Sequence, residues 1–324
     1  MPVRLTSLVD RLYKAICAVD HPASRQSGIS CIFAPAATCS AVFILLIMST
    51  LNSMAAPPTD SSPAKPSDEF INRLSNIESC NGTDPPGSPD PQIKGCSALI
   101  NSRKETTALL AVAHNNRGNA YIVKGDYAHA IEDYNLAIKY NPTYSKPFNN
   151  RGVAFQKKGE YDRAIQDFDQ AIKLSPDYAI AFANRGETHQ KRREYQSAVQ
   201  DYGEAIRLNA SLKGVWNGRC WARAVVGELR EALADCNKAL LVQPNDAASF
   251  DARGLTYLKM GQLDAAIEDY SAALRIESNM ASALYGRGLA KLKKGDAVNG
   301  NADLTAAKKL ETSISDDFSR YGVK

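Results

Sequence analysis

The sequence is short of the residues on which most enzyme active sites depend. It has 4 histidines in 324 residues: His21, His114, His129 and His189. None of them has a Cys, Asp or Glu at the spacing of a metal site or a catalytic triad. The motifs HExxH and GxSxG and a glycine-rich phosphate loop are also missing. These absences argue against an enzyme, and we expect no cofactor and no bound metal.

An excess of charge of one sign is missing too. The chain carries 39 Lys and Arg against 35 Asp and Glu, a formal net charge of +4, and the two signs are mixed along it. Nucleic-acid binding proteins gather basic residues on one surface. We therefore expect no nucleic-acid partner.

Charge is wholly absent from residues 26–59, and Cys31–Leu51 is mostly apolar. Basic residues precede this stretch and small residues follow it, which is the order of an export signal, with Ser53 and Ala55 placed for cleavage before Ala56. Residues 1–55 are thus predicted to be a signal peptide. The alternative is an N-terminal membrane anchor, because residues 32–51 are about 20 residues long, enough to span a bilayer. Both interpretations place the rest of the chain outside the cytoplasm.

The seven cysteines divide into two groups. Three lie in or before the apolar stretch, and the remaining four form two pairs, each 16 residues apart and each centred on a turn-rich segment. Level positions on two antiparallel helices can be bridged, so we predict the disulfides Cys80–Cys96 and Cys220–Cys236. The alternative is four buried thiols that pack as small core residues.

Most of the chain repeats itself every 34 residues. "NNRGNAYIVKGDYAHAIEDY" begins at Asn115 and "NNRGVAFQKKGEYDRAIQDF" at Asn149, and six such copies run from Ala111 to Ile314. Bulky residues recur at the fourth place of each copy, small residues at the eighth, and Ala or Gly at the twentieth and twenty-seventh. Apolar residues at helical spacing, interrupted by a Gly-centred turn, predict two helices in each copy. One such hairpin cannot bury its own apolar face, so the copies must stack.

An Arg stands at the seventh place and an Asp at the twenty-third place of every copy. These places lie level across a helical hairpin, and we predict that they pair in a ladder along the stack, within one copy or with the next. Anion binding by the arginines is the alternative. The pairs are Arg117 and Asp133, Arg151 and Asp167, Arg185 and Asp201, Arg219 and Asp235, Arg253 and Asp269, and Arg287 and Asp303.

This pattern resembles the tetratricopeptide repeat (TPR) family. The resemblance implies an all-α, right-handed α-solenoid of six 34-residue helix-turn-helix repeats with terminal capping helices. The predicted organisation is a Pro/Ser-rich linker at 56–66, N-terminal capping helices with a disulfide at 67–110, six repeats at 111–314, and a C-terminal capping helix at 315–324. In that last helix we expect Tyr321 to pack against the last copy, with a role in binding as the alternative.

The resemblance also implies a concave groove lined by the first helix of each copy. Carried over place by place, the candidate binding residues are Asn115, Asn119, Asn149, Gln156, Lys157, Gln190, Lys191, Asn217, Trp221 and Tyr285. Lys146, Glu187, Asp251, Lys259 and Lys293 fall at further groove places. Amide side chains suit an extended peptide backbone, and the two aromatic residues suit anchors. For any one of these positions, an ordinary solvated residue is the alternative.

The predicted function is a non-enzymatic scaffold that binds a protein or peptide partner in the bacterial cell envelope. The chain would be exported, either periplasmic or anchored in the inner membrane facing the periplasm. The clamp that some members of the family use for chaperone tails is not supported, because its basic places hold Asn115, Ile180 and Asn184. Two alternatives remain, namely a structural envelope component, and an accessory protein that binds a glycan or another small ligand by stacking on Trp221 and Tyr285.

Overall fold

The computed structural model describes residues 67–82 and 88–323. The predicted signal or anchor segment and the linker at 56–66 lie outside the described residues. Within the described ranges every regular element is an α-helix. None of these helices combines the length and the apolar character needed to cross a membrane.

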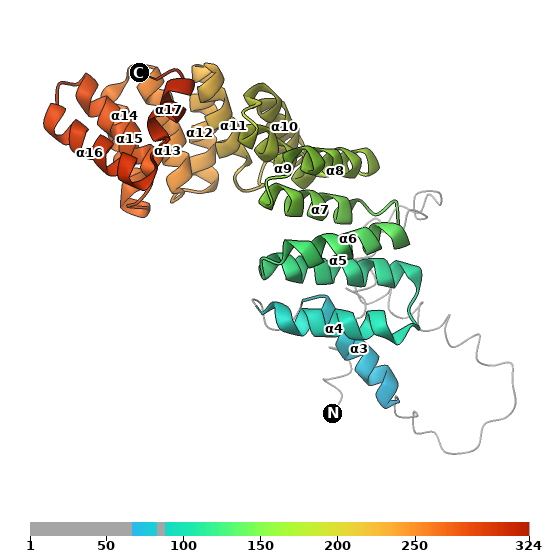
Figure 1. Cartoon of the computed structure of the whole chain (residues 1–324). Helices are drawn as coiled ribbons and strands as arrows, with labels where there is room; N and C mark the ends of the chain where they lie inside the picture. The colour runs from blue at the N-terminus through green and yellow to red at the C-terminus, as the bar shows by residue number, and fades with distance from the viewer. Residues whose placement is uncertain (1–66, 83–87, 324) are drawn as a thin grey trace, which may run out of the picture. The chain divides into compact units, whose positions relative to one another are not determined.

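Helices α3 (Asp68–Cys80) and α4 (Pro89–Ser102) precede six consecutive pairs, and α17 (Ile314–Arg320) follows them (Figure 1). The pairs are α5 (Thr107–Val123) and α6 (Tyr127–Tyr140), α7 (Ser145–Lys157) and α8 (Tyr161–Leu174), α9 (Ala179–Lys191) and α10 (Tyr195–Leu208), α11 (Val215–Val226) and α12 (Leu229–Val242), α13 (Ala247–Lys259) and α14 (Leu263–Ile276), and α15 (Ala281–Lys293) and α16 (Ala297–Leu310). We number the copies 1 to 6 in this order.

Each helix packs against the next one along the chain, and the first helices of neighbouring copies also contact one another. The expected all-α solenoid is confirmed. We call the surface formed by α5, α7, α9, α11, α13 and α15 the first-helix face. It is the surface on which the candidate groove residues are carried.

The turn inside each copy reverses the chain through a residue in the left-handed region. Glycine fills this place in five copies, with φ between 75° and 94° at Gly125, Gly159, Gly227, Gly261 and Gly295. Copy 3 has Arg193 instead, at φ 66°. A left-handed conformation costs an L-residue with a Cβ about 1–2 kcal/mol, so copy 3 makes the same turn under strain.

A small residue at the eighth place lets the second helix of the copy press an aromatic ring against the first helix. A Cβ built on Gly152 would lie 2.7 Å from Cε1 of Phe168, and one on Gly254 would lie 2.9 Å from Tyr270. Both rings are fully buried. The ring therefore fills the space that the missing side chain leaves.

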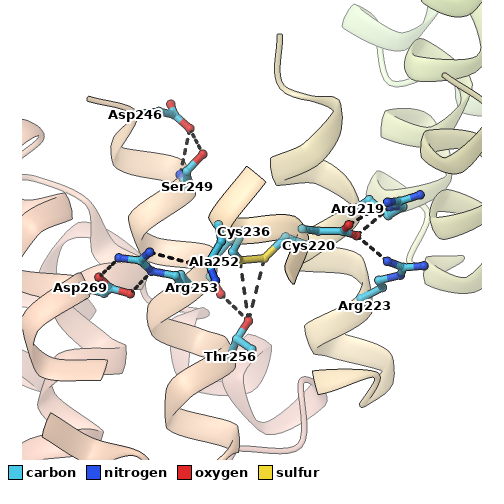
Figure 2. Close-up of a disulfide and its surroundings, with 12 residues drawn as sticks. Arg219, Cys220, Arg223, Cys236, Asp246, Ser249, Ala252, Arg253, Thr256 and Asp269 are labelled. Carbon is cyan, nitrogen blue, oxygen red and sulfur yellow. Dashed lines mark hydrogen bonds and ion pairs between the residues drawn. A yellow bond between two sulfur atoms is a disulfide. The ribbon is translucent and has the colours of Figure 1, made fainter. Parts of the chain in front are cut away.

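In copy 4, two cysteines replace the glycine and the aromatic ring. Cys220 and Cys236 hold the places of the glycine and the ring, and the structure joins them by a disulfide with a Cα–Cα distance of 5.2 Å (Figure 2). A second disulfide joins Cys80 at the end of α3 to Cys96 in α4, with a Cα–Cα distance of 4.5 Å. Both cysteine pairs are the ones proposed from their spacing.

The predicted Arg–Asp ladder is confirmed, and each rung lies within one copy. In every copy Arg Nε donates to one carboxylate oxygen of the Asp at 2.7–2.8 Å, and Nη2 donates to the other at 2.6–2.8 Å. The Arg side chains are 15–22% exposed and the Asp side chains 3–12% exposed. Such two-pronged, largely buried pairs fix the relative position of two helices.

The remaining nitrogen of the guanidinium reaches the preceding copy. Arg151 Nη1 donates to Asn135, Arg185 Nη1 to Asp169 and Arg253 Nη1 to Asn237, over 2.5–2.9 Å. The bulky residue at the fourth place lies under the same guanidinium in copies 2 to 5, with 5.1–5.7 Å from the guanidinium carbon to the ring centroid. The Arg therefore binds its own copy and the preceding one at once.

A double-mutant cycle on Arg151→Met and Asp167→Ala tests this rung. Each single substitution leaves the other charge largely buried and unpaired, so we expect each to lower the free energy of unfolding by about 3 kcal/mol. The coupling energy between the two should be at least about 1 kcal/mol. Urea unfolding of the four proteins gives these values.

The exposed pair Arg207 and Glu204, with side chains 63% and 46% exposed, is the matched control. Its coupling energy should stay below about 0.5 kcal/mol. Equal coupling in the two cycles would contradict a special role for the ladder.

Candidate functional site

The ten candidate groove residues all lie on first helices, but they differ in exposure. Lys157 and Lys191 are exposed, and Asn119, Gln190, Asn217 and Trp221 are half-buried. Asn115, Asn149, Gln156 and Tyr285 are buried, at 3–9% relative exposure. The first-helix face therefore offers a ligand only part of the polar surface expected from the sequence.

The buried asparagines hydrogen-bond to asparagines of neighbouring copies. Asn150 Nδ2 donates to Oδ1 of Asn115 at 3.0 Å and to Oδ1 of Asn119 at 2.9 Å, and Asn184 Nδ2 donates to Oδ1 of Asn149 at 2.9 Å. These bonds join α5, α7 and α9 side by side. The expectation that Asn115 and Asn149 meet a peptide backbone is therefore corrected, because their amides are buried and bonded within the array.

Copies 2 and 3 keep an open polar surface beside this asparagine ladder. Gln156 is turned inwards, where its Nε2 donates to Oγ1 of Thr188 at 2.9 Å. Gln190 accepts from the Tyr202 hydroxyl at 3.1 Å, and its amide nitrogen makes no hydrogen bond to the described residues. Lys157 on α7 and Lys191 on α9 are exposed, and Lys191 pairs with Glu187 at 3.3 Å. Together with Gln190, they can donate to the backbone carbonyls or carboxylates of a ligand.

The two expected aromatic anchors are covered by the end of the chain itself. Tyr321 lies edge-on to Trp221, with their ring centroids 5.1 Å apart. The ring centroids of Phe318 and Tyr285 are 4.9 Å apart. Tyr321, which we expected to pack against the last copy, packs against the apolar cluster that includes Tyr285 and Ala290 of copy 6, and its ring also reaches Trp221 of copy 4. The short helix also begins at Ile314 and ends at Arg320, a little earlier than the expected range of 315–324.

The polar side chains on the first-helix face change in copies 4 to 6. Copy 4 has Asn217 and copy 5 has Asp251 at the fifth place, where copies 1 and 2 have bonded asparagines. One oxygen of Asn217 and one of Asp251 are buried with no hydrogen-bond partner in the described part of the chain. The other oxygen of Asp251 accepts from the Ser282 hydroxyl at 2.9 Å. Burial without a cationic partner raises the pKa of Asp251 to about 7.

Histidine has a structural role that the sequence analysis did not anticipate. His114 lies 19 residues from Asp133, and its Nδ1 lies 2.8 Å from an Asp133 oxygen, with both side chains buried. Burial pushes the pKa of Asp133 up, but the hydrogen bonds from Arg117 and His114 outweigh it and lower the pKa. Within residues 67–82 and 88–323, no three His, Cys, Asp or Glu side chains come close enough together to hold a metal ion.

Comparison with known proteins identifies the family. A model described as "Tetratricopeptide repeat" matches residues 111–144 and 145–178, which are copies 1 and 2 as numbered above, and one described as "TPR repeat" matches 254–295. The chain belongs to the tetratricopeptide repeat family. No curated protein sequence matches it.

Solved structures show the same fold at low sequence identity. A tetratricopeptide repeat protein from Parabacteroides merdae is 18% identical, with a TM-score of 0.57 over 78% of this chain and 99% of its own. The Cut9–Hcn1 hetero-tetramer of the APC/C matches at 17% identity and a TM-score of 0.59, over 78% of this chain and 52% of its own. PilF of Pseudomonas aeruginosa matches at 16% identity and a TM-score of 0.56, over 66% of this chain and 98% of its own.

The buried carboxyl of Asp251 predicts a pH-dependent stability. Its pKa is about 7 in the folded chain against an ordinary value of 3.8. Between these values the folded state holds a proton that the unfolded state releases, so Asp251 costs stability increasingly as the pH rises from about 4 to about 7. Asp251→Asn cannot ionise and still accepts from Ser282. We expect it to raise the free energy of unfolding by about 1–4 kcal/mol at pH 8 and to lose most of that gain at pH 4.

Urea unfolding of the wild type and Asp251→Asn across this pH range measures the difference. Asp177→Asn, in an exposed turn, is the matched control and should follow the wild type. A gain for Asp251→Asn that is the same at pH 4 and pH 8 would show that ionisation of Asp251 is not its cause.

Proposed function

We propose that this protein is a non-enzymatic scaffold that binds a protein or peptide segment on its first-helix face. Tetratricopeptide repeat proteins generally mediate protein interactions and are generally non-catalytic. The observation that carries the proposal is the set of side-chain donors on the first helices of copies 2 and 3, of which Lys191 is paired, among the described residues, only with the exposed carboxylate of Glu187, at 3.3 Å. Lys157 and Lys191 are exposed there, on the neighbouring first helices α7 and α9, and α9 also carries the half-buried amide of Gln190.

The arrangement favours an extended segment with carboxylate side chains. The asparagine ladder holds α5, α7 and α9 in fixed register, so the donors above it are already in place before a ligand arrives. Backbone carbonyls of a ligand can accept from Gln190, and carboxylates can pair with the lysines. The glycan alternative lacks the same support, because Tyr321 and Phe318 cover the two rings on which a sugar would stack.

Photo-crosslinking in the native organism tests which face binds. A benzophenone amino acid at Lys157 or Gln190 should capture a partner, while the same group at Glu204, an exposed position on the second helix α10, should not. Adding Lys191→Glu should reduce the yield from Gln190, since it reverses a charge beside the proposed ligand. Equal yields from Gln190 and Glu204 would contradict binding on the first-helix face.

We further propose that the chain works outside the cytoplasm of a bacterium, in the periplasm or anchored in the inner membrane. Two disulfides, one in the N-terminal hairpin and one in copy 4, support an oxidising compartment. The order of basic, apolar and small residues in 1–55 supports export. Retention of residues 32–51 would add the inner membrane as a partner.

Thiol counting on protein purified from its native host without reductant tests the compartment. We expect no alkylation of Cys80, Cys96, Cys220 or Cys236 before reduction and alkylation of all four after it. Cys220→Ala with Cys236→Ala should lower the free energy of unfolding by about 2–5 kcal/mol relative to the oxidised protein. Four reactive thiols in the unreduced sample would contradict the oxidising compartment.

A further inference from the structure

We propose that the first-helix face of copies 4 to 6 is a second docking site, for an amphipathic helix of a partner protein, and that the C-terminal segment Ile314–Val323 is its resident intramolecular ligand. The proposal rests on the proposed function, since it assumes that the first-helix face binds protein segments. Beyond that function, it assigns a separate site on copies 4 to 6 and the chemistry of the ligand that binds there. It also states that the C-terminal segment competes with that ligand for the site.

The C-terminal segment sits on residues at groove places of three copies. Tyr321 covers Trp221 on α11, and Phe318 covers Tyr285 on α15. Ile314, Phe318 and Val323 share one buried cluster with Leu255 and Leu258 of α13. Figure 1 shows α17 at the C-terminal end of the array, where its backbone lies against α15 and α16. The segment therefore reaches well beyond the end of the last copy, where a simple cap would stop.

The segment makes the contacts of a bound peptide. Ile314, Phe318 and Tyr321 recur at intervals of four and three residues, so one stripe of the short helix faces the array. Ile314 and Phe318 are 3% and 2% exposed, while Asp316, Ser319 and Arg320 are exposed on the other side. An apolar stripe laid into a groove is the recognised way in which a helix binds such a surface.

The bonding of the segment makes it displaceable. Among the described residues, no hydrogen bond or ion pair joins Ile314–Val323 to α11, α13 or α15, and the polar contacts of the segment are internal, as between Arg320 and Asp317. A helix of seven residues has little stability of its own. Side-chain packing alone holds it, and an external helix can supply the same packing.

The resident segment thus defines the ligand that the site accepts. A partner would carry an aliphatic residue followed four and seven residues later by aromatic ones, on a helix whose other face is polar. In the free protein the segment covers the site. A partner therefore binds with an affinity reduced by the fraction of molecules in which the site is open.

Trp221 provides a direct readout. The chain has two tryptophans, and Trp216→Phe leaves Trp221 as the sole reporter. Phenylalanine already fills the equivalent fourth place at Phe148, Phe182 and Phe250, so the array should accept it. In this background we expect Phe318→Ala with Tyr321→Ala to expose Trp221 to acrylamide quenching. Ser319→Ala, on the exposed side of the segment, should leave the quenching unchanged.

The ligand probe is a synthetic peptide of residues 311–324, ETSISDDFSRYGVK, carrying fluorescein at its N-terminus. We expect it to bind the Phe318→Ala/Tyr321→Ala protein and to shield Trp221 again. Binding to the intact chain should be at least about ten-fold weaker. A peptide with serine in place of Phe318 and Tyr321 should bind neither protein.

Each result of these experiments either supports or overturns the second docking site. Unchanged acrylamide quenching of Trp221 in the double variant, or a peptide that fails to bind this variant, overturns the proposal. If circular dichroism shows that the double variant loses helix, labelled peptide on the intact chain decides instead: binding that is saturable and weakened by Trp221→Ala supports the proposal, and its absence overturns it. Peptide-driven dimers of the intact chain would make a second copy the occupant and overturn the assignment to a partner.

Crosslinks from Lys157 or Gln190 test copies 2 and 3 separately. Failure of the site on copies 4 to 6 therefore leaves the proposed function standing, and failure of the crosslinks on copies 2 and 3 leaves the site on copies 4 to 6 standing.

Discussion

The paired Arg and Asp of each copy fix the positions of three helices along one another. The carboxylate lies on the second helix, the guanidinium on the first, and the spare guanidinium nitrogen reaches the second helix of the preceding copy in most of the array. Apolar packing stabilises such a stack but does not choose its register, because Ala and Leu faces fit one another in several positions. A two-pronged ion pair that is largely buried fits in only one position. The register of the first helices, and hence the relative position of every groove residue, depends on this ladder.

Register in turn decides what the first-helix face can present. In copies 1 to 3 the ladder brings asparagines of successive first helices within hydrogen-bonding distance, and these side chains satisfy one another. Lys157 and Lys191 on the same helices stay exposed to solvent, and Gln190 stays half-buried. In copies 4 to 6 the fifth place holds Asn217, Asp251 and Tyr285. In the described part of the chain no bond between asparagines continues the ladder there, and one side-chain oxygen each of Asn217 and Asp251 lies buried without a hydrogen-bond partner. One continuous surface therefore divides into a polar half and an aromatic half with different binding chemistry.

The sequence predicted the features that recur at fixed places in the repeats, and it did not predict the contacts between copies or the position of the non-repeating C-terminal segment. The helices, their turns, the cysteine pairs and the Arg–Asp rungs follow from spacing, because each depends on residues at fixed places within one helical hairpin. The asparagine ladder depends on contacts between copies, and its signal was the recurrence of Asn at the fifth and sixth places, which solvated residues would also show. The position of Tyr321 could not be read from spacing at all. It follows from the way a non-repeating segment folds back across three copies.

The C-terminal segment affects both the stability of the array and its binding of ligands. A solenoid leaves an apolar face at each end, and a short helix that covered only copy 6 would be enough to shield it. Here the segment extends to copy 4 and buries the aromatic residues that an external ligand would need. Covering Trp221 adds stability to the free chain, yet among the residues that the structure describes no hydrogen bond or ion pair joins the segment to α11, α13 or α15, so other apolar side chains could replace it. The same contacts therefore stabilise the isolated protein and set the affinity threshold that a partner helix must exceed.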